Sequence, residues 1–504
     1  MFLKKAKTLY DKLEQVMFKF PDTSEKFKLA NFLGGILITG STRSGKSSAV
    51  LKHFVKAWFK KGYGGLYTTT RLGDDKDLIN WATQSDRAED VVLFDKNSNF
   101  RFNLLEYYSN EDTNILTDKL LQIQELISSF QSGSKGDKEE AFWKNTTKTL
   151  LDMILTLVAL SKVKLSWKLI RKIALGTFSE EEHQRYFDLR AILETTDEDS
   201  EEWLNAFSEY QRWKERNWFI QCFELANERT EMNEEELELM QVVGEYFMDE
   251  YPKLSTKTTS IIIQMVISIT TPFESKGILR SHFSEGLSPE IHPSVTTKSN
   301  KIVIIGFGPK EHKLAGLVAT SIMKMTYQEF WEARDIKKVG LDATPIMLCI
   351  DEFQMYFSNA SKDTLFASTA GGSLVSQVYV TQNLDNLIMA CGGNSPESRA
   401  KSLCANLNTK CFVSNSSYST NLWASNMIGK HWVDTTSTQI NLESSNSQTY
   451  GQAYHYKVPI DHFTTLKTGR KENNYQVESI VFQTGRKWKS NNDQNFAEIT
   501  FSQV

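Results

Sequence analysis

The hydrophobic and polar positions of this chain follow two patterns in turn. Short apolar runs bounded by turns alternate with amphipathic segments over the first hundred residues, and again beyond residue 300. We expect buried strands at Ile36 to Ile38, Gly65 to Thr70, Val91 to Asp95, Lys301 to Phe307, Pro345 to Asp351 and Val378 to Thr381. Helices are expected at Ala49 to Lys60, Lys76 to Gln84 and Lys313 to Arg334. This alternation is typical of βαβ units and predicts an α/β fold with a central, mostly parallel sheet.

Between residues 110 and 255 the pattern becomes helical throughout, with few glycines and a single proline. The clearest helices are expected at Leu116 to Phe130, Glu140 to Leu160, Trp203 to Asn227 and Glu234 to Asp249. We therefore predict an all-α domain at 110–255, inserted into an α/β domain made of residues 34–109 and 256–504. Its first half ends in a basic patch and its second half is acidic, and charge blocks of this kind serve solubility or partner docking.

The remaining segments give weaker signals. Residues 1–33 read as an N-terminal helical segment that begins with an amphipathic helix, and Thr259 to Ile269 as an apolar helix or strand. Alternating segments at Gln476 to Thr484 and Ala497 to Phe501 indicate edge strands or a small antiparallel addition. The polar stretch Thr435 to Gln452 is typical of a mobile loop or a segment that lines a ring. Five cysteines form no C-x-x-C pair, so we expect reduced thiols and no metal site at them.

Composition limits the possible functions. Of the 504 residues, 40% are apolar and 24% charged, which is ordinary for a globular protein. The net charge of −4 creates no overall basic field, so any DNA contact would need local loops or a ring lumen. The longest apolar run, near residues 150–160, contains Asp152 and is too short to span a bilayer. We expect a cytoplasmic chain, attached to the inner membrane only through a partner.

The stretch GGILITGSTRSGKSS contains the first candidate chemistry. Gly40, Gly45, Lys46 and Ser47 satisfy the Walker A pattern G-x-x-x-x-G-K-[ST], between an apolar strand and a helix. In such a loop the backbone N–H groups and the helix N-terminus bind nucleotide phosphates. Lys46 would reach the β- and γ-phosphates, and the Ser47 hydroxyl would bind Mg²⁺. The full set of expected nucleotide-binding residues is Gly40, Ser41, Thr42, Arg43, Ser44, Gly45, Lys46, Ser47 and Ser48.

A second segment, IMLCIDEFQ, supplies the carboxylates that such a loop needs. The buried strand ends in Asp351 and Glu352, a Walker B pattern. We assign Asp351 to the Mg²⁺ shell and Glu352 to the orientation and deprotonation of the attacking water. The next strand ends in Thr381-Gln382-Asn383, and we expect Gln382 to sense the γ-phosphate. Together these residues predict an ATPase that uses ATP and Mg²⁺.

The ordered set of motifs resembles a known family. The motifs, in chain order, are GxxxxGKS at Gly40 to Ser47, FNLL at Phe102 to Leu105, FW at Phe142-Trp143, KIVIIGF at Lys301 to Phe307, IDEFQ at Ile350 to Gln354 and TQN at Thr381 to Asn383. This order is similar to that of the TraG/TraD-type coupling ATPases of conjugative type IV secretion, within the FtsK/HerA branch of RecA-like motors. The resemblance runs from about Gly34 to Gly429.

The resemblance implies a RecA-like P-loop fold and a homo-hexameric ring that hydrolyses ATP between subunits and moves DNA through its centre. It also implies that the all-α domain faces relaxosome or secretion-channel proteins. Two features depart from the family. The transmembrane helices that usually begin such proteins are not found, and the segment Ser368 to Ser373 lacks the arginine that acts in trans on a neighbour's nucleotide. Arg399 and Lys410 are the candidate replacements.

Three functions are compatible with these residues. The first is an ATP-driven DNA translocase of the coupling type. The second is a HerA-like motor that works with a nuclease in repair, packaging or anti-phage defence. The third is a nucleotide-gated docking protein with little hydrolysis. The sequence leaves open the strandedness of the DNA, the ring size and the docking partner.

Overall fold

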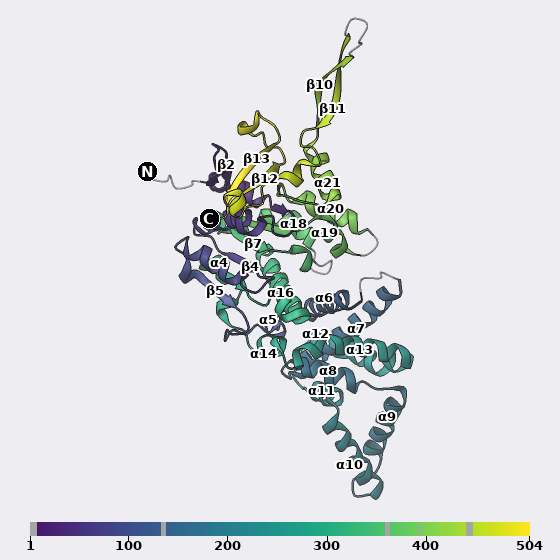
Figure 1. The fold of residues 1–504 in the computed structure, drawn as a ribbon. Coiled ribbons are helices and arrows are strands. Elements are labelled where there is room, and N and C mark those ends of the chain that lie inside the picture. Colours follow the sequence, from purple (N-terminus) through teal and green to yellow (C-terminus); the bar gives the residue numbers. More distant parts are fainter. Residues whose placement is uncertain (1–7, 133–137, 358–362, 393–394, 440–446) are drawn as a thin grey trace. The chain divides into compact units, whose positions relative to one another are not determined.

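A computed structural model describes residues 8–132, 138–357, 363–392, 395–439 and 447–504 (Figure 1). Contacts between residues divide the chain into two compact units. The first, the sheet unit, comprises Met1–Ser98, Glu290–Lys313 and Met323–Val504. The second, the helical unit, comprises Asn99–Pro289 and Leu314–Ile322. The predicted limits of the inserted domain, 110 and 255, lie inside the helical unit, and the extent of an independently folding domain stays a prediction.

The sheet unit is built on nine strands in the order β13-β12-β9-β3-β8-β7-β4-β6-β5. From β9 to β5 all neighbours are parallel, whereas β12 pairs antiparallel with β9 and with β13. The strands are β3 (Ile36–Thr39), β4 (Gly65–Thr68), β5 (Val91–Phe94), β6 (Ile302–Ile305), β7 (Ile346–Ile350), β8 (Val375–Thr381), β9 (Thr409–Phe412), β12 (Gln476–Gln483) and β13 (Phe496–Ser502). The predicted α/β class with a mostly parallel central sheet is confirmed.

Apolar residues on both faces explain why the parallel strands are buried. All residues of β3, β4, β6, β7, β8 and β9 are buried, as expected for a parallel sheet covered by helices on both sides. The longer helices of the sheet unit are α3 (Lys52–Phe59), α4 (Asp74–Thr83), α16 (Pro309–Glu332), α18 (Asp363–Thr369), α19 (Leu384–Cys391), α20 (Pro396–Asn406) and α21 (Tyr418–Ile428). Most of α16 belongs to this unit, and its Leu314–Ile322 turns belong to the other.

The N-terminal segment differs from its prediction. Helix α1 covers only Leu9–Leu13, and β1 (Val16–Lys19) and β2 (Lys26–Lys28) form an antiparallel pair before α2 (Leu29–Leu33). The expected long amphipathic helix is therefore wrong within the described residues. The reason is aromatic packing, because Phe18, Phe20 and Phe27 contact one another and join the core of the sheet unit. Tertiary burial here outweighs local helix propensity.

The helical unit contains no strand of four or more residues within its described range. Its helices include α5 (Leu104–Tyr107), α6 (Thr113–Ser132), α7 (Lys138–Ser161), α8 (Trp167–Gly176), α9 (Glu180–Thr195), α10 (Glu201–Arg216), α11 (Trp218–Asn227), α12 (Glu234–Glu245), α13 (Thr256–Glu274) and α14 (Ile278–Phe283). Ser and Asn side chains start many of them, as N-caps at Ser166, Ser179, Ser200, Asn217, Asn233 and Ser255. Asn217 thus splits the single helix predicted from Trp203 to Asn227 into α10 and α11. The predicted all-α character is confirmed.

The polar stretch around residues 430–456 is not a plain loop. It forms β10 (Lys430–Gln439) and β11 (Ser447–Tyr456), a two-stranded ribbon separate from the main sheet (Figure 1). Every residue of β10 whose surroundings are described is exposed. The expected loop or lumen segment is therefore mostly strand, and its centre, 440–446, lies outside the described residues.

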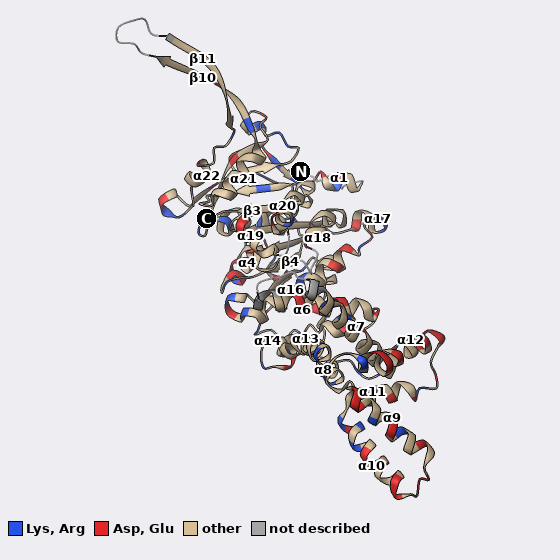
Figure 2. Ribbon diagram, turned by 90° about the vertical axis from the view of Figure 1, so that its right-hand side faces the viewer, with Lys and Arg blue, Asp and Glu red and all other residues tan. Residues whose placement is uncertain are grey.

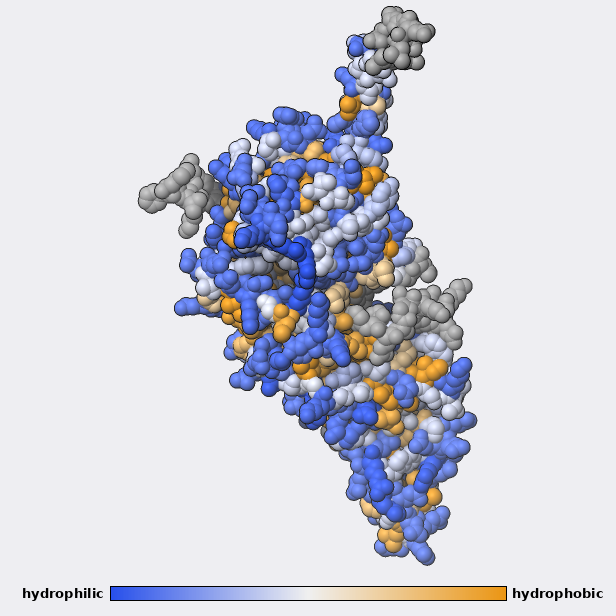
Figure 3. Space-filling view, in the orientation of Figure 1, coloured by the Kyte–Doolittle hydropathy of each residue, from blue (hydrophilic) through white to orange (hydrophobic). Residues whose placement is uncertain are grey.

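Surface and membrane features add little to this arrangement. Hydrophilic residues dominate the face drawn in Figure 3, and basic and acidic residues are interspersed in Figure 2. In the described parts of the chain no helix combines the length and apolar character needed to cross a bilayer. All five cysteines are free and buried, as expected for reduced thiols.

Candidate nucleotide-binding site

The phosphate loop connects β3 to the helical segment that begins at Lys46. Its first turn, Lys46–Leu51, is wider than an α-helix and continues into α3. Gly45 adopts φ 90°, a left-handed conformation, and a Cβ there would lie 2.4 Å from a Val477 methyl group. A Cβ on Gly40 would lie 2.2 Å from Val413. Both glycines are therefore required by the loop's conformation and close packing, which explains two fixed positions of the motif.

Inside the loop the side chains divide into buried and exposed sets. Lys46 is 4% exposed and donates a hydrogen bond to the Ser41 carbonyl at 3.1 Å. The Ser44 hydroxyl is buried without a hydrogen-bond partner in the described structure. Thr42 and Arg43 are exposed. A buried lysine and an unpaired buried hydroxyl within one loop provide donors for a ligand that carries negative oxygens.

The structure brings the two predicted halves of the site together. The Ser47 hydroxyl donates a 2.6 Å hydrogen bond to Asp351 Oδ2, across 304 positions of sequence. Asp351 follows β7 directly, and Glu352 comes next with φ 52° in the left-handed region. A non-glycine residue held at positive φ is strained, and such residues cluster at functional sites. The Asp-Glu pair is thus fixed at the carboxyl end of β7 beside the phosphate loop.

Gln382 lies in the same group. Strand β8, which ends at Thr381, lies between β3 and β7. The Gln382 amide donates to Glu352 Oε1 at 3.4 Å, and its backbone carbonyl accepts from the N–H of Gly40 at 3.1 Å. One residue therefore contacts both the phosphate loop and the acidic pair. The amide could transmit a change at either of them to the other.

Several residues of this corner were missed by the sequence reading. Arg71 Nη2 donates to Glu352 Oε1 at 2.9 Å, and the Thr70 hydroxyl donates to the Asp351 carbonyl at 3.0 Å. The Asp74 carboxylate accepts from the N–H groups of both Thr70 and Arg71. The polar residues that follow β4 are only a partial signal, because carboxyl ends of neighbouring parallel strands meet at one edge but the sequence does not show that β4 lies beside β7.

A further missed residue follows β9. The buried Asn415 side chain donates to the Gln382 carbonyl at 3.1 Å, and the Ser41 hydroxyl donates to Asn415 Oδ1 at 3.4 Å. The corner therefore collects residues from the carboxyl ends of five adjacent strands, β9, β3, β8, β7 and β4.

The two candidate trans-acting cations lie elsewhere. Lys410 is on β9 and only 3% exposed, so its ammonium is not at the surface where a neighbouring subunit could be reached. This corrects the expectation for Lys410. Arg399 is on α20, partly exposed, and donates to the Cys391 carbonyl at 3.2 Å. Ser48 is exposed and its hydroxyl accepts from the Gln503 amide at 2.7 Å.

The electrostatics distinguish the two acids. Burial raises the pKa of Asp351, although the hydrogen bond from Ser47 opposes the shift. For Glu352, burial would also raise the pKa, but the hydrogen bond from Gln354 and the charges of Lys46 and Arg71 outweigh it and lower the pKa. Burial lowers the pKa of Lys46, which the two carboxylates partly restore. The two neighbouring carboxyl groups therefore differ in the direction of their pKa shifts, raised for Asp351 and lowered for Glu352.

Oxygen ligands suit a magnesium ion at this corner. Ser47 and Asp351 place a hydroxyl and a carboxylate oxygen 2.6 Å apart, and Mg²⁺ prefers such ligands while keeping waters and phosphate oxygens in its shell. In the described residues no group of three or more His, Cys, Asp or Glu could hold a metal ion alone. The residues present therefore fit a Mg²⁺ ion that is bound together with a nucleotide.

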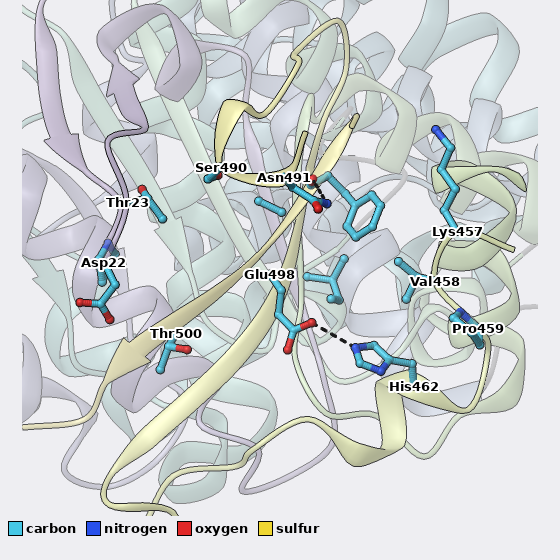
Figure 4. Close-up of a pocket in the computed structure, with 14 residues that line it drawn as sticks. Asp22, Thr23, Lys457, Val458, Pro459, His462, Ser490, Asn491, Glu498 and Thr500 are labelled. Carbon is cyan, nitrogen blue, oxygen red and sulfur yellow. Dashed lines mark hydrogen bonds and ion pairs between the residues drawn. The ribbon is translucent and has the colours of Figure 1, made fainter. Parts of the chain in front are cut away.

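A separate pocket of about 550 Å³ contains none of these residues (Figure 4). Its lining includes Asp22, Lys457 and Ser490, and His462 lies 3.2 Å from Glu498. The lining contains both basic and acidic side chains, and His462 is already paired with Glu498. This pocket therefore does not extend the nucleotide site.

Comparisons with known proteins concern the family and the fold of the chain. Residues 345–462 match a family model described as the TraM recognition site of TraD and TraG. No curated protein matches the chain by sequence. The solved structure of the unbound bacterial conjugative coupling protein TrwBdeltaN70 is 12% identical, with a TM-score of 0.55 over 98% of this chain and 89% of that chain.

Two further solved structures, both of TrwB, contain nucleotides. TrwB in complex with a non-hydrolysable ATP analogue, ADPNP, is 11% identical with a TM-score of 0.57, over 98% of this chain and 89% of that chain. TrwB with ADP and Mg²⁺ is 12% identical with a TM-score of 0.54, over the same shares. These matches establish the RecA-like fold with its inserted all-α domain. The chain is therefore similar to the TraG/TraD-type coupling ATPases, by sequence over residues 345–462 and by fold over nearly its whole length.

Proposed function

We propose that this chain is an ATP-driven DNA translocase of the coupling type, which delivers DNA or a nucleoprotein to a secretion channel. The observation that carries the proposal is the hydrogen bond between Ser47 and Asp351, which joins the phosphate loop to the acidic pair. A phosphate loop alone binds nucleotide. Hydrolysis also needs a carboxylate in place to activate water, and Glu352 stands next to that hydrogen bond.

Each residue then has a separate task. Backbone N–H groups of the loop and the Lys46 ammonium bind the phosphates, with Lys46 held by burial within a rigid turn. Ser47 and Asp351 hold the Mg²⁺, which when bound neutralises charge on the phosphate oxygens. Glu352 orients the attacking water and accepts its proton, and Gln382 links the nucleotide to Glu352. These roles require no group that the corner lacks.

The mechanical part of the proposal follows from the fold. RecA-like motors act as rings, and we infer a homo-hexamer that moves DNA through its lumen. TrwB, described as a conjugative coupling protein, has the same fold and binds an ATP analogue and ADP with Mg²⁺. A partner of the TraM kind would meet residues 345–462, whereas docking of a relaxosome or channel protein on the helical unit is a separate proposal.

The test separates binding from chemistry. Lys46→Ala removes the buried cation and is expected to weaken ATP binding by at least about 10²-fold, as for the loss of a preorganised charge. Glu352→Gln keeps the shape and should retain ATP binding at least as tight as that of the wild type, with turnover reduced by about 10²- to 10⁴-fold. Equal ATPase rates in Glu352→Gln and wild type would remove Glu352 as the base.

The motor claim needs a second assay. The ATPase rate of the wild type should rise several-fold with DNA, and DNA affinity should fall steeply with salt, since phosphate contacts release counterions. Mass measurement with a bound ATP analogue should give a hexamer. ATPase activity that ignores DNA would leave an NTPase but contradict the translocase.

A further inference from the structure

The Glu352 carboxylate is almost fully occupied by protein donors. Its Oε1 accepts from Arg71 at 2.9 Å and from Gln382 at 3.4 Å, and its Oε2 accepts from Gln354 at 2.7 Å. A carboxylate offers about four acceptor sites, so three are taken. A general base must hydrogen-bond the water that it deprotonates. One acceptor site therefore remains for a water, and the release of a donor would free a second one and make the carboxylate a better base.

Arg71 is the donor best able to move. Gln354 is two residues from Glu352 and belongs to the same turn. The backbone of Arg71 is fixed by Asp74, but its side chain is 42% exposed, whereas that of Glu352 is 5% exposed. Arg71 also lines a pocket of about 440 Å³ at the strand ends, and Lys76 lines the same pocket. The backbone of Arg71 is thus held in place, whereas its guanidinium has space to move.

The alternative partner for this guanidinium is a phosphate. Arginine's planar donors match carboxylate and phosphate oxygens alike, and a terminal phosphate offers more negative charge than one carboxylate. The positive charge of Arg71 contributes to the lowered pKa of the Lys46 ammonium, so both cations act on the same space. Lys46 is the residue assigned to the β- and γ-phosphates.

We propose that Arg71 senses the γ-phosphate in the same subunit, by exchanging its ion pair with Glu352 for one with the nucleotide. The proposal rests on the nucleotide site of the proposed function. With a diphosphate bound, Arg71 stays on Glu352 and the base is restrained. With a triphosphate bound, Arg71 turns to the γ-phosphate and Glu352 becomes free to contact water. The chain thereby supplies an arginine near the nucleotide although residues 368–373 contain none.

Binding measurements with ADP and a non-hydrolysable ATP analogue test this exchange without relying on activity. Arg71→Ala should weaken the analogue about tenfold, the equivalent of about 1.4 kcal/mol, and change ADP affinity less than about twofold. Lys76→Ala, which removes another cation from the same pocket, should change neither affinity. Arg71→Lys keeps the positive charge but loses the paired N–H donors of the guanidinium. Its affinity for the analogue is expected to lie between those of the wild type and Arg71→Ala.

The competing carboxylate gives a sharper test. Glu352→Gln should tighten analogue binding several-fold, because the analogue no longer competes for Arg71. In the Arg71→Ala background the same substitution should have no effect, so the two changes are strongly non-additive. Tightening that persists without Arg71 would overturn the proposal, as would equal losses of ADP and analogue in Arg71→Ala.

Two outcomes separate this inference from the proposed function. If wild type binds neither nucleotide, the nucleotide site itself is wrong. If wild type binds both and Arg71→Ala leaves their affinity ratio unchanged, only the sensing role of Arg71 is wrong. Should Arg71→Ala fail to fold by circular dichroism, Arg71→Lys decides, since an unchanged ratio there together with an additive Glu352→Gln effect overturns the exchange.

Discussion

The nucleotide corner and the β10–β11 ribbon are held together in opposite ways. In the corner, side chains from five strands meet through non-local hydrogen bonds, such as the Ser47 to Asp351 contact across 304 positions. In the ribbon, each residue pairs with its cross-strand neighbour, as Trp432 does with Tyr454, and the side chains are exposed. A change in the corner should therefore affect distant partners, whereas a change in the ribbon should remain local.

The buried ion pair behind the acidic turn gives the largest expected effect on stability. Lys324 and Asp363 are both fully buried, with Nζ 2.6 Å from Oδ2, and Lys324 also donates to the Tyr356 carbonyl at 2.6 Å. Tyr356 follows the turn that carries Glu352. Lys324→Ala leaves a buried carboxylate without its cation and should lower the free energy of unfolding by about 3–5 kcal/mol, measured by chemical denaturation.

The matched control removes both charges. Lys324→Met combined with Asp363→Leu should recover most of that loss, because replacing a buried pair by apolar residues is often neutral or stabilising. If the double variant is as unstable as the single one, the cost comes from lost packing and not from an unpaired charge. The contrast between the nucleotide corner and the ribbon would then be weaker, because the corner would depend on shape more than on polar contacts.

Lys410 offers the second largest effect, with the opposite sign. Burial lowers the pKa of its ammonium from 10.5 to about 8. The folded state therefore releases its proton at lower pH than the unfolded state, so stability should rise as pH increases from about 8 to 10.5. At neutral pH the buried charge costs about 3 kcal/mol, from 1.36 kcal/mol for each pKa unit.

Lys410→Met should recover that energy at pH 7 and abolish the rise between pH 8 and 10.5. Chemical denaturation at a series of pH values measures both. Stability of the wild type that is flat or falls across this range would contradict the assigned direction. A stabilising substitution on β9, the strand beside β3, would show that not every buried polar group of the sheet unit contributes to stability.

The sequence predicted which motif residues meet in the corner better than it predicted their surroundings. Lys46, Ser47, Asp351, Glu352 and Gln382 were found because motif spacing and strand ends constrain them, and the structure places them together, although their roles stay predictions.

Other features could not be predicted because they depend on tertiary contacts. Arg71 was missed because no local pattern shows that β4 lies beside β7, a neighbour relation set by the sheet order. The β1–β2 pair was missed because its aromatic side chains pack on distant elements of the core. Long-range burial thus determined what local propensity could not.

The ribbon was missed for a different reason and provides the smallest expected effect. Its Ser-, Thr- and Gln-rich composition reads as a loop, yet Trp432 contacts Tyr454 with ring centroids 5.0 Å apart, and the Lys430 ammonium lies 4.5 Å from the centre of the Tyr456 ring. Trp432 is 66% exposed, so it buries little surface. Trp432→Ala should lower the free energy of unfolding by only about 0.2–1 kcal/mol, the usual range for one cross-strand pair.

The same variant tests whether the ribbon is independent of the corner. Because its described contacts are local, Trp432→Ala should leave the affinities for ADP and the ATP analogue within about twofold of wild type, as expected for sites that share no partners. Thr438→Ala, on the same face and opposite Gln448, is the matched control and should change stability still less. A large loss of nucleotide affinity in Trp432→Ala would show that the ribbon supports the corner, and the contrast between distant and local effects would no longer hold.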